Sequence, residues 1–391
     1  MDRILLPFRL NNLLNTLFIS NAFISYHYAL VIYVNSSFLG KFFTETQISS
    51  LYIIGSIVNV FLLLNASKII EKIGVYKFTV FTILAEFMAI FGLVFLNSPL
   101  FIGLFFISHL CAISLLIFNM DVLVESVSNN DNITGSIRGT YLTITNIMLV
   151  MAPLSVSFLV SDSNYSLVYS LSSLIIIPIY FLIKKFKDTK EIKINHINVR
   201  QTLQKCFQNS DLYNILISHT ILQLFYAFMV IYTPIYLQKY IGFSWSEIGV
   251  IFTIMLLPFI LFELPVGELE DDTYGEKEFL TVGFIIMGIS ALVISFITEK
   301  DFWLWAVILF ISRVGASLVE ISTESYFFKK VSKEQTDIVG MFRIGRPLAL
   351  ILSPIIATLV LQFIPFQYIF IVVGTLMIVG THYSLALRDT K

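Results

Sequence analysis

Two acidic pairs interrupt otherwise apolar parts of the chain. Asp121 and Glu125 form the first pair, and Glu320 and Glu324 form the second. Residues four apart share one face of a helix, where each carboxylate can form an ion pair with a basic side chain of a neighbouring helix. Equivalent acids in the two pairs are the same distance apart in the chain. This predicts two similar halves with ionic contacts at equivalent positions.

The repeat extends to other residues. Val31-Ile32-Tyr33 recurs as Val230-Ile231-Tyr232 at the offset that relates the acidic pairs, and Glu71 corresponds to Asp271 one position later. Each matching pair occupies a similar place within, or at the end of, an apolar run. We therefore expect two structurally related halves.

Arg313 is a positive charge deep inside an apolar run. It lies about 11 residues into the run, roughly 16 Å along a helix, which would be near the centre of a bilayer. A charge at that depth costs several kcal/mol unless it faces protein or water. We expect Arg313 either to bind a substrate or counter-ion or to pair with another helix. Its counterpart at the repeat offset is Ser114.

Polar residues also gather in three other apolar runs. Each run contains a histidine, and two of them add tyrosine or glutamine nearby; the residues are His27, Tyr28, His109, His219, Gln223 and Tyr226. Such residues either line a polar pathway or hold helices together through hydrogen bonds. Both interpretations stay open. At the repeat offset His27 matches Tyr226, which places them at equivalent positions of the two halves.

Carboxylates inside apolar runs are candidates for proton transfer. Glu263 lies more than one turn inside a run, and Glu320 lies two turns beyond Arg313 on the same helix face. A buried carboxylate can exchange a proton near neutral pH. We therefore consider both residues for proton coupling, with Glu320 also a candidate for an ionic contact at the end of its run.

These residues must be positioned by membrane-spanning helices. The chain has 391 residues, of which 57% are apolar and 13% charged, and its mean hydropathy is +0.85. Soluble domains carry about a quarter charged residues, and a helix needs about 20 apolar residues to cross a bilayer. We predict an all-α integral membrane protein with twelve spans, at 13–38, 47–70, 76–97, 100–126, 138–161, 165–184, 212–239, 245–268, 277–298, 302–329, 336–362 and 366–387.

The longest hydrophilic stretch divides the spans six and six. We predict an N-terminal six-helix bundle at 1–184, a cytoplasmic linker at 185–211 and a C-terminal six-helix bundle at 212–391. Lys and Arg concentrate in cytoplasmic loops. With both termini in the cytoplasm, all but four of the 25 Lys and Arg residues lie on that side, the exceptions being Lys41, Lys239, Lys300 and Arg313. We expect a multi-pass protein of a plasma or inner membrane.

A loop motif joins the second and third spans. It reads Ser67-Lys-Ile-Ile-Glu71-Lys72-Ile-Gly74-Val-Tyr-Lys77, and a second, degenerate copy in the other half includes Gly267 and Asp271. With its twelve spans and central loop, the chain resembles the major facilitator superfamily of secondary transporters. The loop motif of that family has a small residue, an acid, a base and a glycine in that order. This chain departs from it in two places: Ser67 replaces the usual glycine, and in the second copy Gly275 lies one position later than the motif requires. A glycine permits the tight turn between the helices.

The resemblance implies a gate at the cytoplasmic side. In this family the loop motif is braced by acids ending the fourth and tenth spans and by an arginine opening the fifth and eleventh. The implied gate residues are Ser67, Glu71, Lys72, Gly74, Lys77, Asp121, Glu125, Arg138, Gly267, Asp271, Glu320, Glu324 and Arg343. Static ion pairs at the membrane surface are the alternative. Glu86 lies on a span that is peripheral in the family, so we expect a local polar contact there.

The resemblance also implies the function. We expect a secondary active transporter that moves a small solute by alternating access, coupled to a proton or another ion; a drug or amphiphile exporter of the same fold and a non-transporting sensor are alternatives. The sequence contains no GxxxxGK[ST] phosphate loop, no HExxH and no nucleophile elbow. We therefore expect no enzyme activity, no cofactor, no metal and no nucleic-acid partner. Substrate and lipid bilayer are the expected partners, and a monomer is expected to suffice.

Overall fold

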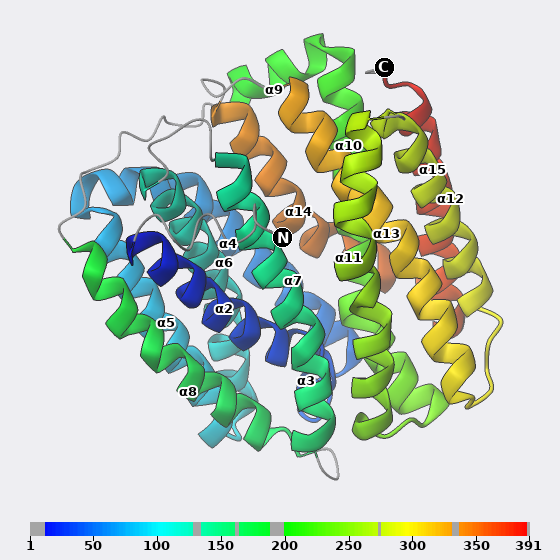
Figure 1. Cartoon of the computed structure of the whole chain (residues 1–391). Coiled ribbons are helices and arrows are strands. Elements are labelled where there is room, and N and C mark those ends of the chain that lie inside the picture. The colour runs from blue at the N-terminus through cyan, green and yellow to red at the C-terminus, as the bar shows by residue number, and fades with distance from the viewer. Residues whose placement is uncertain are drawn as a thin grey trace. The chain divides into compact units, whose positions relative to one another are not determined.

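The computed structural model describes residues 12–127, 134–160, 164–187, 199–272, 275–330 and 336–388. Every regular element in these ranges is a helix. The chain divides into two compact units, Met1–Ile194 (unit 1) and Asn195–Lys391 (unit 2), drawn in blue to green and in green to red (Figure 1). The predicted linker overlaps this division, but residues 188–198 lie outside the described ranges.

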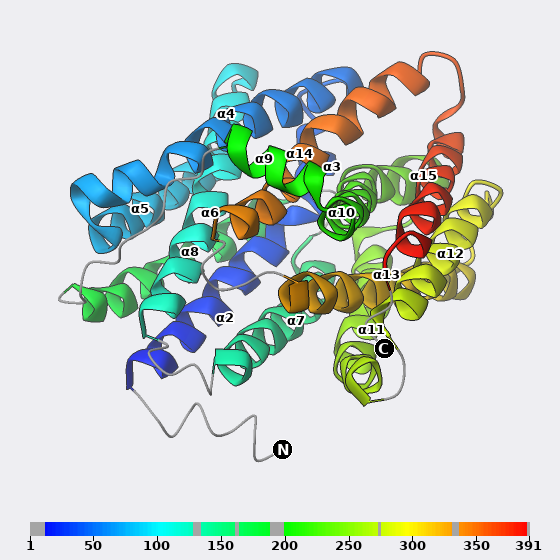
Figure 2. The same cartoon turned by 90° about the horizontal axis from the view of Figure 1, so that it is seen from above.

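Unit 1 is a bundle of long helices. α6 packs against α2, α4 and α5, while α8 packs against α2, α5 and α7, so that α2 and α8 run side by side (Figures 1 and 2). The helices are α2 (Asn12–Ile32), α3 (Asn35–Leu39), α4 (Glu45–Ile73), α5 (Val75–Phe95), α6 (Pro99–Val127), α7 (Thr134–Leu159), α8 (Ser166–Ile183) and the short η2 (Lys184–Phe186).

Local sequence explains how α4 begins and ends. At its start the Thr44 hydroxyl accepts from Gln47 N at 3.3 Å while Gln47 Oε1 accepts from Thr44 N at 2.9 Å, a reciprocal cap that satisfies two terminal donors. At its end Gly74 adopts φ +83° and ψ 151°, a conformation that is nearly exclusive to glycine. The motif glycine is therefore required by the turn from α4 into α5.

The first predicted span is broken, contrary to the expectation of one helix over 13–38. α2 ends at Ile32, and α3 begins again at Asn35. The side chain of Asn35 accepts a hydrogen bond from the Tyr169 hydroxyl of α8 at 2.7 Å, and the Phe38 ring lies 4.7 Å from the Tyr169 ring. These long-range contacts hold the short helix against α8.

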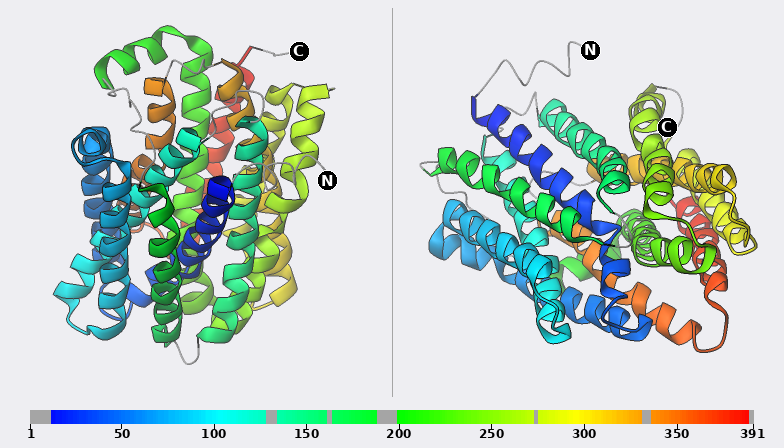
Figure 3. Two further views of the ribbon diagram at one scale, coloured as in Figure 1. Left: turned by 60° about the vertical axis from the view of Figure 1, so that its left-hand side comes forward. Right: turned by 90° about the horizontal axis from the view of Figure 1, so that it is seen from below.

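Unit 2 is a second helical bundle. α13 packs against α10, α11 and α12, α15 packs against α10 and α12, and α14 packs against α10; the short α9 crosses the ends of α10 and α14 (Figures 2 and 3). The helices are α9 (Val199–Gln208), α10 (Ser210–Ile235), the π-helical η3 (Tyr236–Ile241), α11 (Trp245–Asp272), α12 (Glu276–Ile294), α13 (Phe302–Lys330), α14 (Thr336–Val360), η4 (Phe366–Tyr368) and α15 (Ile369–Leu385).

Ten of the described helices are long and apolar enough to cross a membrane. The two predicted spans outside this set correspond to α2, which carries several polar residues, and to α7, whose apolar part covers only Thr143–Leu159. Large apolar side chains remain exposed on several helices, including Phe61 at 67% and Phe158 at 82%. Such surfaces are expected where helices contact hydrocarbon.

Candidate functional site

Arg313 lies at a buried position of unit 2. Its side chain is 2% exposed, and its Cζ atom lies 4.8 Å from the centroid of the Phe225 ring. Arg313 belongs to α13 and Phe225 to α10. A desolvated cation over an aromatic face gains about 2 kcal/mol. The arginine inside the span is thus set against an aromatic side chain of α10.

Glu320 lies two turns beyond Arg313 on α13. The hydroxyl of Tyr226 donates a hydrogen bond of 2.6 Å to Glu320 Oε2. Tyr226 follows Phe225 on α10, so adjacent aromatic residues of one helix contact both ionisable side chains of the other. The Tyr226 ring also lies 6.2 Å from the ring of Phe259 on α11.

The polar stripe on α10 serves two neighbours. His219 stacks on the Phe342 ring of α14 at 3.7 Å between centroids. A Cβ atom at Gly345 would lie only 2.9 Å from His219 and 3.8 Å from the side chain of Gln223. His219 and Gln223 therefore lie against α14, whereas Tyr226 reaches α13. Three residues that the sequence placed on one stripe have different partners.

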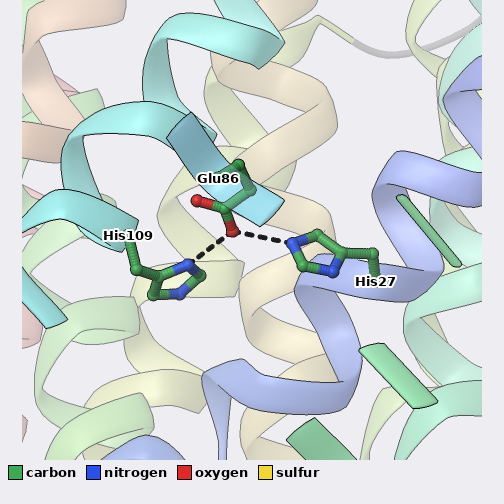
Figure 4. A group of neighbouring side chains, drawn as sticks. All are labelled: His27, Glu86 and His109. Atoms are coloured by element: carbon green, nitrogen blue, oxygen red, sulfur yellow. Dashed lines mark hydrogen bonds and ion pairs between the residues drawn. The ribbon is translucent and has the colours of Figure 1, made fainter. Parts of the chain in front are cut away.

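Three ionisable side chains meet inside unit 1. His27 Nε2 lies 2.7 Å from Glu86 Oε1, and His109 Nδ1 lies 2.6 Å from the same oxygen (Figure 4). They come from α2, α5 and α6 respectively, and their side chains are at most 1% exposed. Sequence reasoning named His27 and His109 separately as pathway candidates and expected a local polar contact for Glu86, but it did not predict that the three would meet.

The triad is continued by Ser172 on α8. His27 Nδ1 lies 3.0 Å from the Ser172 carbonyl oxygen and 2.7 Å from its hydroxyl. On the other side, Glu86 Oε2 and His109 Nε2 are buried without a hydrogen-bond partner in the described structure. The remaining pathway candidate of α2, Tyr28, packs against the apolar core of unit 1.

Residue types alone would allow the triad to hold a metal ion. One donor atom from each side chain lies within 4.8 Å of the others. Ligands of a tetrahedral zinc ion with bonds of about 2.1 Å lie about 3.4 Å apart, whereas both nitrogens here lie within 2.7 Å of Glu86 Oε1. These distances fit hydrogen bonds between the imidazole nitrogens and the carboxylate oxygen better than they fit ligands of a metal ion.

Two of the predicted gate residues of unit 2 lie close enough to form an ion pair. Arg343 Nη1 of α14 is 3.6 Å from Glu324 Oε1 of α13. Gly267 of α11 has ordinary space around it, since a Cβ atom there would lie 3.6 Å from Ile321. The side chains of Asp271 and Glu263, also on α11, lie outside the described part of the structure.

The predicted gate residues of unit 1 lie at helix ends. Glu71 and Lys72 occupy the last turn of α4, Lys77 lies in the first turn of α5, and Asp121 lies near the end of α6. Between them Gly74 forms the turn already described. The side chains predicted for the same gate at Ser67, Glu125 and Arg138 lie outside the described residues.

Sequence reasoning missed two buried acids near the second motif copy. Glu270 on α11 is fully buried and accepts a hydrogen bond from the Ser322 hydroxyl. Glu276, which begins α12, is fully buried and lies 2.5 Å from Lys329 Nζ. The motif spacing pointed to Asp271 instead. Because Glu270 and Glu276 flank the loop, the shifted Gly275 was the one signal that could have drawn attention to its neighbours.

Comparison with known families agrees with the fold. The model of the Major Facilitator Superfamily matches residues 215–390. Over these residues the chain is similar to the major facilitator superfamily. Among solved structures, a point mutant of the nucleoside transporter NupG superposes with a TM-score of 0.72 at 14% identity, covering 96% of this chain and 99% of that one. A search of characterised proteins gives no match.

The protein is therefore a secondary transporter of the membrane and not an enzyme. The family match falls in unit 2, and the structural likeness extends the fold to nearly the whole chain. At 14% identity that likeness concerns the fold alone. The solute must be inferred from the residues of this transporter.

Proposed function

We propose that this transporter carries a small solute with an anionic group and a flat apolar body, driven by a proton gradient. The observation that carries the proposal is the buried guanidinium of Arg313 over the Phe225 ring. A guanidinium binds carboxylate or phosphate oxygens in a bidentate manner. Phe225, Tyr226 and Phe259 offer ring faces beside it, against which an apolar body can pack.

Glu320 and Tyr226 complete this solute site. Glu320 lies on the same helix as Arg313, and its hydrogen bond to Tyr226 links the acid to the aromatic residues beside the arginine. A solute anion that binds Arg313 changes the electrostatic field at Glu320. Binding of solute is thereby communicated along α13 towards Glu324, one turn further on.

The cytoplasmic gate consists of the ionic residues at the helix ends. The Glu324–Arg343 contact supports this role in unit 2, and the glycine turn at Gly74 supports it in unit 1. Exposed ion pairs are individually weak, so several must open together. Twelve spans in a six-plus-six arrangement, with both termini in the cytoplasm, are consistent with the distribution of Lys and Arg and with the ten apolar helices.

The experiment is solute uptake by the purified full-length protein in liposomes. Wild type is tested with small carboxylates, phosphate esters and nucleosides; nucleosides are included because NupG, which has the same fold, is described as a nucleoside transporter. We expect saturable uptake of at least one anionic solute. Arg313→Ala abolishes it, and Arg313→Lys retains a part because the charge is kept without the planar fork.

The matched control removes a cation from the surface. Lys300 is 46% exposed and pairs with Glu247 at 3.3 Å, so Lys300→Ala should leave uptake unchanged. Uptake by Arg313→Ala at the wild-type rate contradicts the solute site. Ligand binding without uptake by the wild-type protein would favour a sensor, and preferential transport of cationic amphiphiles would favour an exporter.

A further inference from the structure

We propose that His27, Glu86 and His109 form a proton-binding site in unit 1 that releases and takes up one proton in each transport cycle. This inference rests on the proposed function, because it supplies the site for the proton that drives the solute. It differs from the candidates Glu263 and Glu320, which the sequence suggested and which both belong to unit 2.

Burial forces the triad to hold a compensating proton. Glu86 is fully buried, and its ion-pair partners among the described residues are His27 and His109. An unpaired carboxylate in a protein interior costs several kcal/mol. One of the two histidines must therefore be an imidazolium for Glu86 to remain ionised at low cost.

The contacts of His27 allow it to be the charged histidine. His27 Nδ1 lies 3.0 Å from the Ser172 carbonyl oxygen, which can only accept, and 2.7 Å from the Ser172 hydroxyl, which can donate or accept. Nε2 of His27 lies 2.7 Å from Glu86 Oε1. The Ser172 hydroxyl in turn donates to the His27 carbonyl oxygen at 3.2 Å. We assign a hydrogen to both ring nitrogens, so that Nδ1 donates to Ser172 and Nε2 donates to Glu86, and in this assignment His27 is the imidazolium.

His109 completes a triad of zero net charge. In the same assignment His109 is neutral: its Nδ1 donates to Glu86 Oε1 at 2.6 Å, and its Nε2, which has no described partner, carries the lone pair. One imidazolium, one carboxylate and one neutral imidazole sum to zero. Loss of one proton from His27 to water leaves a neutral ring and a net charge of −1 on the triad.

Two atoms make exchange with water feasible once the helices separate. Glu86 Oε2 and His109 Nε2 lack partners in the described structure, so a water molecule can bind either atom without breaking an existing bond. While α2, α5 and α6 are packed together, the charged state is disfavoured by burial. Proton release is thereby tied to a change in helix packing, which is what coupling requires.

Among the described residues, the helices that carry or contact the triad also hold titratable thiols and phenols. On α6, Cys111 donates to the Gly55 carbonyl oxygen at 3.6 Å. Tyr52 of α4 packs on Phe106, Tyr169 of α8 bonds Asn35, and Tyr26 of α2 bonds Ser155 of α7. Thiols and phenols ordinarily titrate above neutral pH. Within this neighbourhood the triad supplies the groups suited to exchange at physiological pH.

The first test observes the proton directly and needs no solute. The chain contains 5 histidines, so ¹⁵N-histidine labelling of the full-length protein in liposomes gives a small set of ring-nitrogen signals by solid-state NMR. Between about pH 5 and pH 9, the range in which histidine normally titrates, we expect one imidazolium whose signal disappears reversibly with rising pH. Glu86→Gln should remove this imidazolium at neutral pH, because the neutral amide no longer stabilises it.

The second test separates coupling from transport. An inward gradient of about one pH unit can drive about tenfold accumulation of a monoanionic solute with one proton, equivalent to about 1.4 kcal/mol. The solute is an anionic member of the panel that wild type transports. Glu86→Gln should lose accumulation above equilibrium yet retain exchange at equal pH to within about twofold. His109→Gln, whose amide can still donate to Glu86, is a second variant that tests the same site if Glu86→Gln does not fold.

The outcomes are distinguishable. The site is overturned by triad imidazoles that stay neutral across the pH range, by wild-type accumulation in Glu86→Gln, or by loss of both accumulation and exchange in folded Glu86→Gln. A stoichiometric transition metal in purified wild type that is lost in Glu86→Gln would also overturn it. Absence of any flux in wild type contradicts the proposed function, whereas the NMR result still decides whether the triad binds a proton.

Discussion

The two units place buried ionisable groups in different surroundings. In unit 1, Glu86 and two histidines from three helices converge on one carboxylate oxygen. In unit 2, Arg313 and Glu320 lie two turns apart on one helix, and their described contacts are with Phe225 and Tyr226. Charges that neutralise each other suit the storage of a proton. Charges set against aromatic side chains suit the binding of a solute.

The helix turns differ between the units as well. The loop glycine of unit 1, Gly74, has φ +83°, while its shifted counterpart Gly275 has φ −83° and ψ 167°, an extended conformation open to other residues. A buried acid, Glu276, follows Gly275 and contacts Lys329. The same motif therefore depends on backbone conformation in one unit and on a buried ion pair in the other.

The largest expected effect comes from removing the acid of the triad. Glu86→Ala removes the counter-charge of the His27 imidazolium, so that the histidine must either lose its proton or stay charged in the interior, and breaking a buried pair in this way costs about 3–5 kcal/mol. We expect a marked fall in the thermal unfolding midpoint in detergent micelles. Glu86→Gln should lose less, because the amide oxygen still accepts a hydrogen bond. Equal midpoints for wild type and Glu86→Ala would show that the two units do not differ as described.

Removal of the hydroxyl that contacts Glu320 should have the next largest effect. Tyr226→Phe removes the donor to the Glu320 carboxyl group, and an acceptor left unsatisfied in this way costs about 1–3 kcal/mol; the variant should also slow solute uptake in the liposome assay. Tyr383→Phe is the control, since the described contacts of Tyr383 are with the rings of Tyr213 and His382. An uptake rate unchanged by Tyr226→Phe would place the solute elsewhere.

A glycine substitution tests the comparison of the turns. Gly74→Ala forces a Cβ atom into a conformation that costs a residue with a side chain about 1–3 kcal/mol, although no atom lies within 4 Å of the added methyl. Gly275→Ala carries no such backbone cost. The unfolding midpoints of the two variants can be compared directly, and a larger loss for Gly275→Ala would reverse the assignment.

The smallest effect is expected at the surface pair. Arg343 and Glu324 are 45% and 25% exposed, so Glu324→Gln should cost at most about 1 kcal/mol, less at high salt because mobile ions screen the pair. The unfolding midpoint measured at low and high salt gives the result. A loss as large as that of Glu86→Ala would show that the gate contact is much stronger than an exposed ion pair.

Local features of the sequence were sufficient for the fold class. Long apolar runs predicted membrane-spanning helices, and ten helices have the necessary length and composition. Gly74 was assigned to a tight turn from the loop motif, and its positive φ agrees. These features succeed because hydropathy, helix caps and glycine conformation depend on residues within a turn or two of one another. Twelve spans, a six-plus-six division and the orientation of the termini stay predictions.

Partners distant in the chain were decided by tertiary structure. Glu86 meets His27, 59 positions away, and the stripe on α10 divides between α13 and α14 because both helices pack against α10. The break after Ile32 depends on contacts with α8. By itself the sequence indicated that Arg313 lies deep inside an apolar helix, where it is buried, but it did not indicate the burial of Glu270 and Glu276. Only packing decided what neutralises them, because that depends on which helix faces bring side chains within hydrogen-bond distance.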